Sequence, residues 1–141
     1  MRKKNDGIEN DLQPYLRREV EKEFSWLTQI EELDFEALES AVRQKVMTVA
    51  ARLIEKHINS DLSDDVGSRQ ACDCGQIARY QGRREKEYST TVGPLKLQRA
   101  YYHCSNCGKG FFPRDKALGL DEGCSSPGLK RMIATTAALV S

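Results

Sequence analysis

The residues best suited to chemistry are four cysteines arranged as two short pairs. One residue separates Cys72 from Cys74, two residues separate Cys104 from Cys107, and a glycine follows each pair. Glycine after the second cysteine allows a tight turn with positive φ, so each turn can present two sulfur atoms. Four thiolates about 2.3 Å from a Zn²⁺ ion form a closed tetrahedral site. The spacing therefore predicts one structural zinc ion bound by Cys72, Cys74, Cys104 and Cys107.

Other roles for these residues are less favoured by the pattern. Ordinary free or buried thiols would have no reason to occur in pairs. A catalytic zinc ion keeps an open coordination position, which four thiolates would close. A redox role for the Cys104 and Cys107 pair lacks the βαβ pattern of such sites. We interpret Cys124 as a free thiol and His103 as a neighbour of the metal site at most. We therefore expect no catalytic residue.

The composition indicates a globular chain with a small core. Of 141 residues, 39% are hydrophobic and 30% charged, which is typical of soluble domains. We find no apolar run of the roughly 18 residues that cross a bilayer. The polar residues 1–7 do not resemble a secretory signal. These features predict a cytoplasmic protein with no membrane partner and no small-molecule substrate, in which cysteines bind metal or stay reduced.

Charge is distributed unevenly along the chain. Residues 1–69 carry 11 Lys and Arg against 15 Asp and Glu, a net charge of −4, whereas residues 70–141 carry 11 against 6, a net charge of +5. Interleaved Arg and Tyr in the second part could contact phosphates and stack on bases. The alternative is a solvated face whose aromatic residues close a small core. The candidate nucleic-acid-binding residues are Arg79, Arg83, Arg84, Lys96 and Arg99.

Apolar residues recur at helical spacing in the first part of the chain. The pattern predicts amphipathic helices over residues 14–29 and 34–58, with Pro14 in the first turn of one and Asp34 as N-cap of the other. The two helices should pair as a hairpin. We expect Phe24, Trp26 and Phe35 to be buried near its turn.

The second part of the chain has the alternation of β-strands. Residues 88–92 and 95–101 predict two antiparallel strands joined at Gly93 and Pro94, with residues 77–83 as a candidate third strand. Ser126 and Pro127 begin another helix, which we expect to be incomplete. The predicted fold is therefore α+β. It comprises an acidic helical hairpin with a linker (1–69), a zinc ribbon of two to three antiparallel strands (70–115), and a turn segment with the start of a C-terminal helix (116–141).

Several segments of the second part resemble the N-terminal region of Kra-type insertion-sequence transposases. They are RYQGRR at 79–84, TVGPL at 91–95, RAYYHC at 99–104, CGKGFFP at 107–113, DKALGL at 115–120 and SPGL at 126–129. The resemblance covers about half of the chain. It implies a DNA-handling zinc module that precedes a DDE-type catalytic domain, and no position of this chain matches the catalytic motifs of that domain.

Two functions follow as hypotheses. The first is the non-catalytic, DNA-binding portion of a transposase, produced by truncation or a frameshift and able to self-associate through its helices. The second is a self-contained zinc-ribbon adaptor that contacts proteins through the acidic hairpin. The sequence favours the first hypothesis because of the resemblance and the basic second part.

Overall fold

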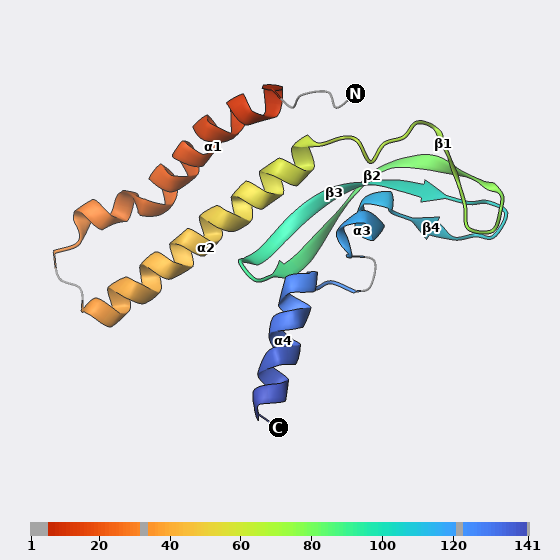
Figure 1. Ribbon diagram of the computed structural model, residues 1–141. Helices are drawn as coiled ribbons and strands as arrows, with labels where there is room; N and C mark the ends of the chain where they lie inside the picture. Colours follow the sequence, from red (N-terminus) through yellow and green to blue (C-terminus); the bar gives the residue numbers. More distant parts are fainter. Residues whose placement is uncertain (1–5, 32–33, 121–122, 141) are drawn as a thin grey trace. The chain divides into compact units, whose positions relative to one another are not determined.

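The protein is described here from a computed structural model, which describes residues 6–31, 34–120 and 123–140. Helices come first and are followed by a four-stranded antiparallel sheet and a C-terminal helix (Figure 1). This arrangement confirms the predicted α+β class. The chain divides into two compact units, Met1–Ser60 and Asp61–Ser141.

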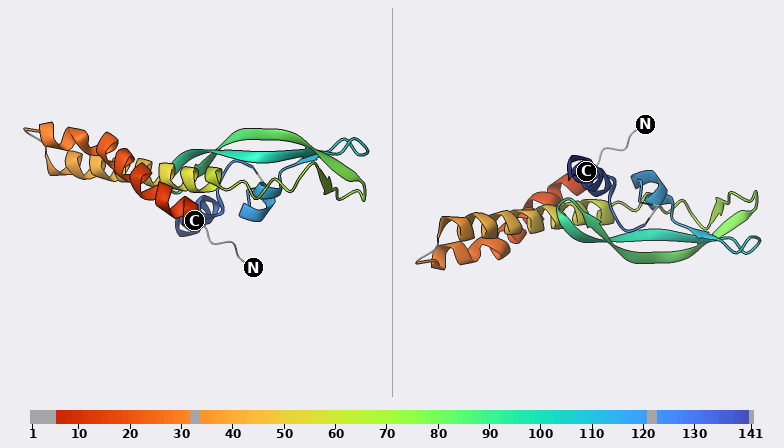
Figure 2. Two further views of the ribbon diagram at one scale, coloured as in Figure 1. Left: turned by 90° about the horizontal axis from the view of Figure 1, so that it is seen from above. Right: turned by 90° about the horizontal axis from the view of Figure 1, so that it is seen from below.

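The first unit is an antiparallel helical hairpin. It consists of α1 (Asp6–Phe24), the short 3-10 helix η1 (Ser25–Gln29) and α2 (Phe35–Ser60), and both views of Figure 2 show α1 and α2 side by side. The Lys45 ammonium forms an ion pair with Glu23 at 3.0 Å. Lys56 lies over the Tyr15 ring at 5.6 Å from its centroid. The middle of α2 thus meets the end of α1 and the end of α2 meets the middle of α1, which confirms the predicted antiparallel hairpin.

Three details of the hairpin bear on the predictions. The Asp34 carboxylate accepts a hydrogen bond from the Ala37 N–H at 2.7 Å, which confirms Asp34 as the N-cap of α2. The first helix begins at Asp6, so Pro14 lies inside it and not in its first turn. Phe35 is 77% exposed, so its predicted burial was wrong. Residues 34–37 are all exposed, because the first turn of α2 is not covered by the hairpin.

The second unit contains the sheet, with strand order β1-β2-β3-β4. Its strands are β1 (Arg69–Ala71), β2 (Ile77–Thr90), β3 (Gly93–His103) and β4 (Gly110–Phe111). The predicted strands 77–83 and 88–92 fall largely within the single strand β2, whose register against β3 shifts between Tyr80 and Arg83. Gly82 at this bulge has φ of +93°, a conformation that favours glycine. The strand ends at Thr90 and the turn is formed by Thr91 and Val92, so the predicted junction at Gly93 and Pro94 was wrong, because both residues pair with β2 at the start of β3. Sequence reasoning therefore found most of the strand residues but divided them wrongly.

Buried side chains occupy both faces of this sheet. Near β1 and β4, one face carries a cluster of Cys72, Ala78, Ala100, Tyr102 and Cys104, with Tyr80 and Phe111 packed against it. Near the β2–β3 turn, the buried residues are Leu95 and Leu97 on β3 and Tyr88, which lies opposite Leu95 on β2. Along β3, Leu95 and Leu97 have odd numbers, whereas Ala100 and Tyr102 have even numbers. The short helix α3 (Pro113–Leu118) packs against β3. Because successive strand residues point to opposite faces, the two clusters lie on opposite sides of the sheet.

Within the segment predicted to be a linker, residues 61–68 lack regular secondary structure but pack on the rest of the second unit. Asp64 within it is only 7% exposed. The Val66 N–H donates to the Tyr102 hydroxyl at 3.0 Å, and that hydroxyl donates to the Gly67 carbonyl at 2.8 Å. The second unit therefore begins at Asp61, eight residues before the boundary that we placed at residue 69.

The C-terminal helix α4 (Pro127–Val140) begins where the sequence predicted. The Leu129 N–H donates to the Ser126 hydroxyl at 3.2 Å, which confirms Ser126 as the N-cap. Residues just before the helix are hydrogen-bonded to β2, because the Ser126 N–H donates to the Ser89 carbonyl at 2.9 Å. All residues of α4 are exposed or half-buried. None of the helices in the described part of the chain is long and apolar enough to cross a bilayer.

Candidate metal centre

Two similar turns present the four cysteines. In one, the Cys72 N–H donates to the Gln76 carbonyl at 2.8 Å and the Gly75 N–H donates to the Cys72 carbonyl at 3.0 Å. In the other, the Cys104 N–H donates to the Lys109 carbonyl at 2.9 Å and the Gly108 N–H donates to the Cys104 carbonyl at 2.8 Å. Gly75 and Gly108 have φ of +88° and +74°, as expected for the glycine after each pair. The sheet brings these two turns together.

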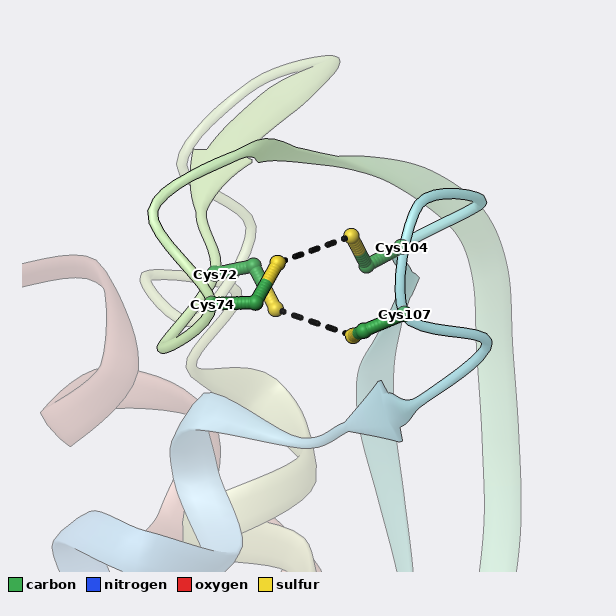
Figure 3. Close-up of side chains that lie close together, drawn as sticks. All are labelled: Cys72, Cys74, Cys104 and Cys107. Atoms are coloured by element: carbon green, nitrogen blue, oxygen red, sulfur yellow. Dashed lines mark hydrogen bonds between the residues drawn. The ribbon is translucent and has the colours of Figure 1, made fainter.

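The four sulfur atoms converge on one point (Figure 3). The Sγ atoms of Cys72 and Cys107 are 3.6 Å apart, as are those of Cys74 and Cys104, and all four lie within 4.8 Å of one another. Sulfur atoms about 2.3 Å from a central ion in a tetrahedron would be about 3.8 Å apart. The cluster therefore has the size of a four-thiolate metal site. The single residue between Cys72 and Cys74 is enough to bring both sulfurs into it.

The surroundings of the thiols favour the thiolate form of Cys74 but not that of Cys72. The Gln76 backbone, followed by the Asn106 side chain, lowers the pKa of Cys74 to about 6. The Cys74 backbone also lowers the pKa of Cys72, but burial and hydrogen bonds with the other three thiols outweigh this and raise it to about 12. A bound cation would stabilise the thiolate form of both, since metal binding requires deprotonated cysteine.

The remaining candidate ligands lie elsewhere. The metal-binding cluster found among the described residues contains neither Cys124 nor a histidine. Cys124 is an exposed free thiol, as predicted. His103 pairs with Arg79 across β2 and β3 and points to the face opposite the neighbouring Cys104. His57 is exposed on α2.

Two of the five candidate nucleic-acid-binding residues are instead paired with carboxylates inside the unit. Arg99 is 3% exposed and forms an ion pair with Asp115 at 2.5 Å. Arg83 pairs with Asp64 at 2.9 Å and also donates to the Gln98 carbonyl. A guanidinium that already binds a buried carboxylate, whether buried itself like Arg99 or half-buried like Arg83, is not available to a phosphate. We therefore withdraw Arg83 and Arg99 as contacts to nucleic acid.

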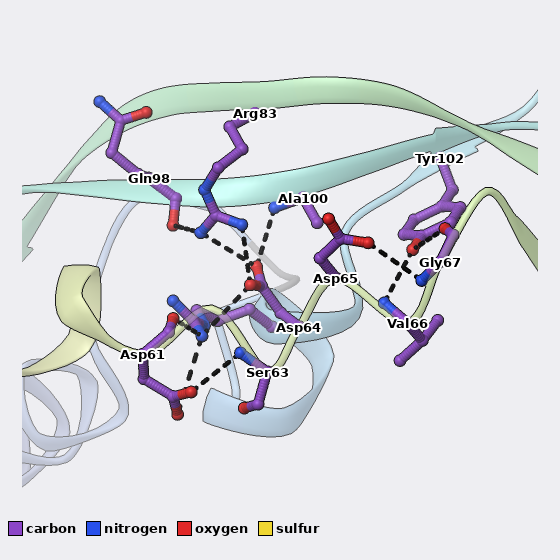
Figure 4. A network of polar contacts seen from close by, with 11 residues as sticks. Asp61, Ser63, Asp64, Asp65, Val66, Gly67, Arg83, Gln98, Ala100 and Tyr102 are labelled. Carbon is purple, nitrogen blue, oxygen red and sulfur yellow. Dashed lines mark hydrogen bonds and ion pairs between the residues drawn. The ribbon is translucent and has the colours of Figure 1, made fainter.

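Sequence reasoning missed the acidic partners of these arginines. Figure 4 shows Arg83 extending from β2 past β3 to Asp64, whose second oxygen accepts the Ala100 N–H at 2.8 Å. Arg114 joins the same group, with its Nη2 3.3 Å from Asp64 Oδ1. Asp64 and Asp115 had no sequence signal as partners because ion pairing across 19 and 16 residues depends on the sheet register.

The other three candidates remain at the surface. Arg79 and Arg84 are exposed on the face of the sheet that carries His103 and Tyr101. Lys96 is exposed on the opposite face, where it lies across from Glu87. The structure therefore does not gather all five residues on one surface.

No protein-family model, curated protein or solved structure matches this chain. The resemblance to insertion-sequence transposases therefore rests on the sequence segments alone.

Proposed function

We propose that the second unit is a zinc ribbon, with one structural Zn²⁺ bound by Cys72, Cys74, Cys104 and Cys107. The observation that carries this proposal is the convergence of four sulfurs from two turns of the same kind, with 3.6 Å between Cys72 and Cys107 and between Cys74 and Cys104. Four thiolates satisfy zinc fully, leave no position for a substrate and stabilise a small fold by cross-linking it. The chain acts as a binding module and has no enzymatic activity.

The metal proposal is tested by native mass spectrometry of the purified chain. One zinc ion per chain is expected, with Cys104→Ser losing most of it. Cys124→Ser is the matched control, because Cys124 lies outside the cluster, and this variant should retain the ion. A wild-type chain without metal, or equal loss in both variants, would overturn the ligand set.

The partner that we propose is DNA, bound by the N-terminal portion of an insertion-sequence transposase. Two features support it: the resemblance of residues 70–141 to that family, and the net charge of +5 over the same residues. Fluorescence anisotropy of the zinc-loaded chain with labelled duplex DNA tests the proposal. Binding that weakens as salt rises is expected, because neutralised phosphates release counterions. Absence of binding at low salt would favour the protein adaptor instead.

A further inference from the structure

The arginines of the second unit fall into two groups with different surroundings. Arg83, Arg99 and Arg114 are bound to Asp64 or Asp115. In the part of the chain that the structure describes, no ion pair to a carboxylate is found for Arg69, Arg79 or Arg84, and all three are exposed. Each arginine of the first group is thus paired with a buried carboxylate, Arg114 also lying near the exposed Asp61, while the positive charge of the second group faces solvent.

Two arginines of the second group are direct neighbours in the sheet. Arg69 on β1 lies opposite Arg79 on β2, and Arg79 lies opposite His103 on β3. Residues opposite each other share one face, and like charges in this position destabilise a sheet. Beside them is a hollow of about 230 Å³ that is also lined by Gln76, Ser105 and Asn106. An anion bound here would offset the repulsion and would meet polar side chains.

Arg84 is held in place on the same face by a stack of side chains. Its guanidinium lies 4.9 Å from the centre of the Tyr101 ring, which lies 4.9 Å from the Phe112 ring. The guanidinium of Arg99 lies 3.8 Å from Phe112 and pairs with Asp115. The stack therefore runs from a buried ion pair to an exposed guanidinium. Because packing orients Arg84 before any ligand binds, less conformational entropy is lost on binding.

Aromatic rings on this sheet have few free surfaces for nucleic-acid bases. Tyr101 is packed against Arg84 and Phe112. Tyr88 and Tyr102 are fully buried, and the ring centroids of Tyr80 and Tyr102 are 5.6 Å apart, so Tyr80 packs against Tyr102. Proteins that bind single strands depend on exposed rings that stack on bases. The arrangement favours contacts to the phosphates of a duplex, which need cations but no stacking surface.

We propose that Arg69, Arg79 and Arg84 form a surface that binds the phosphate backbone of duplex DNA. This inference rests on the proposed DNA-binding function and replaces the set of contacts predicted from sequence. The surface provides affinity without reading base sequence, since backbone contacts position a protein but do not specify bases.

The test compares the zinc-loaded wild-type chain with the triple variant R69Q/R79Q/R84Q in binding to a labelled duplex of random sequence. Each phosphate contact changes the logarithmic salt slope by about 0.9. Three such contacts change the slope by about 2.7. When salt rises from 50 to 200 mM, the triple variant should therefore lose about 40-fold less affinity than the wild type does. The variant K116Q/K130Q/R131Q removes the same charge elsewhere in the unit and should keep the wild-type slope.

The possible outcomes distinguish failure of this surface from failure of the proposed DNA-binding function. If the wild type binds no duplex even at low salt, the DNA-binding function fails and the surface fails with it. If the wild type binds and R69Q/R79Q/R84Q keeps its slope, the surface is wrong while DNA binding stands. Tighter binding to a single strand of equal length would also overturn the surface. Two controls exclude misfolding as the cause of a changed slope. Zinc content is measured for every variant, and R69K/R79K/R84K, which keeps the three charges, should keep the slope.

Discussion

Asp115 is the residue on which much of the second unit depends. It is 6% exposed, pairs with Arg99, and accepts a hydrogen bond from the Tyr88 hydroxyl at 3.0 Å. Burial, together with the charge of Asp115, raises the pKa of Tyr88, so this hydroxyl stays protonated and can donate. One carboxylate thus pairs with a buried cation through Arg99 Nη1 and accepts from a buried hydroxyl. Removing it would leave the charge of Arg99 without a partner.

Asp115→Asn should therefore lower the free energy of unfolding by about 3–5 kcal/mol, the usual cost of an unpaired buried charge. Chemical denaturation of the zinc-loaded chain measures this. Tyr88→Phe is the control, because it removes only a neutral donor and should cost about 1 kcal/mol. Similar losses in the two variants would show that the ion pair is not the larger contribution.

At the scale of elements, the β2–β3 hairpin connects two regions that are held by different contacts. At the end near β1 and β4, short strands of three and two residues depend on the cysteine turns. At the other end, Tyr88, Leu95 and Leu97 are buried with α3 and the Arg99–Asp115 pair. Only the first end is cross-linked by the proposed metal. Metal loss should therefore act on part of the sheet.

We expect chelation of zinc to release the backbone amides of Cys72, Gly75, Cys104 and Gly108 to rapid hydrogen exchange. The amides near Leu95 and Leu97 should stay protected, because their packing does not involve the metal, and α1 and α2 should stay helical. Hydrogen exchange read by mass spectrometry checks both statements. Uniform loss of protection along β2 and β3 would show that the sheet is a single cooperative unit.

Gly110 of β4 lies close to the ring of Tyr101. A Cβ atom on Gly110 would overlap the hydroxyl and ring of Tyr101. Gly110→Ala should therefore displace Tyr101 and release Arg84 from its stack, weakening duplex binding while zinc stays bound. Anisotropy and native mass spectrometry on one preparation check this. Gly128→Ala, where a Cβ would meet Thr91 at an ordinary 3.4 Å, is the control.

At the scale of the whole molecule, α4 has an apolar face without a partner in the described part of its unit. Met132 and Ile133 are 51% and 58% exposed, and Leu139 and Val140 are exposed further. Exposed apolar surface of this kind favours association. The chain is therefore expected to self-associate through α4.

Sedimentation velocity should show oligomers that grow with protein concentration. Ile133→Glu should shift the chain toward the monomer, whereas Thr135→Glu adds the same charge at an exposed polar position and should have a smaller effect. Deletion of residues 126–141 should act like Ile133→Glu. Monomeric wild-type chain at all concentrations would contradict this expectation.

Local patterns in the sequence were sufficient to predict α1, α2 and α4, most strand residues, the caps at Asp34 and Ser126, and the grouping of the four cysteines, whereas α3 was missed. These features depend on residues close together in the chain or on a recognisable spacing. The start of α1 was missed because Pro14 was taken as a residue of the first turn, although Ile8 and Leu12 continue the apolar spacing before it. Only the tertiary structure decided which arginines are free, since the pairing of Arg83 with Asp64 and of Arg99 with Asp115 depends on strand register and burial. Charge is visible in a sequence, but its neutralisation by a distant partner is not.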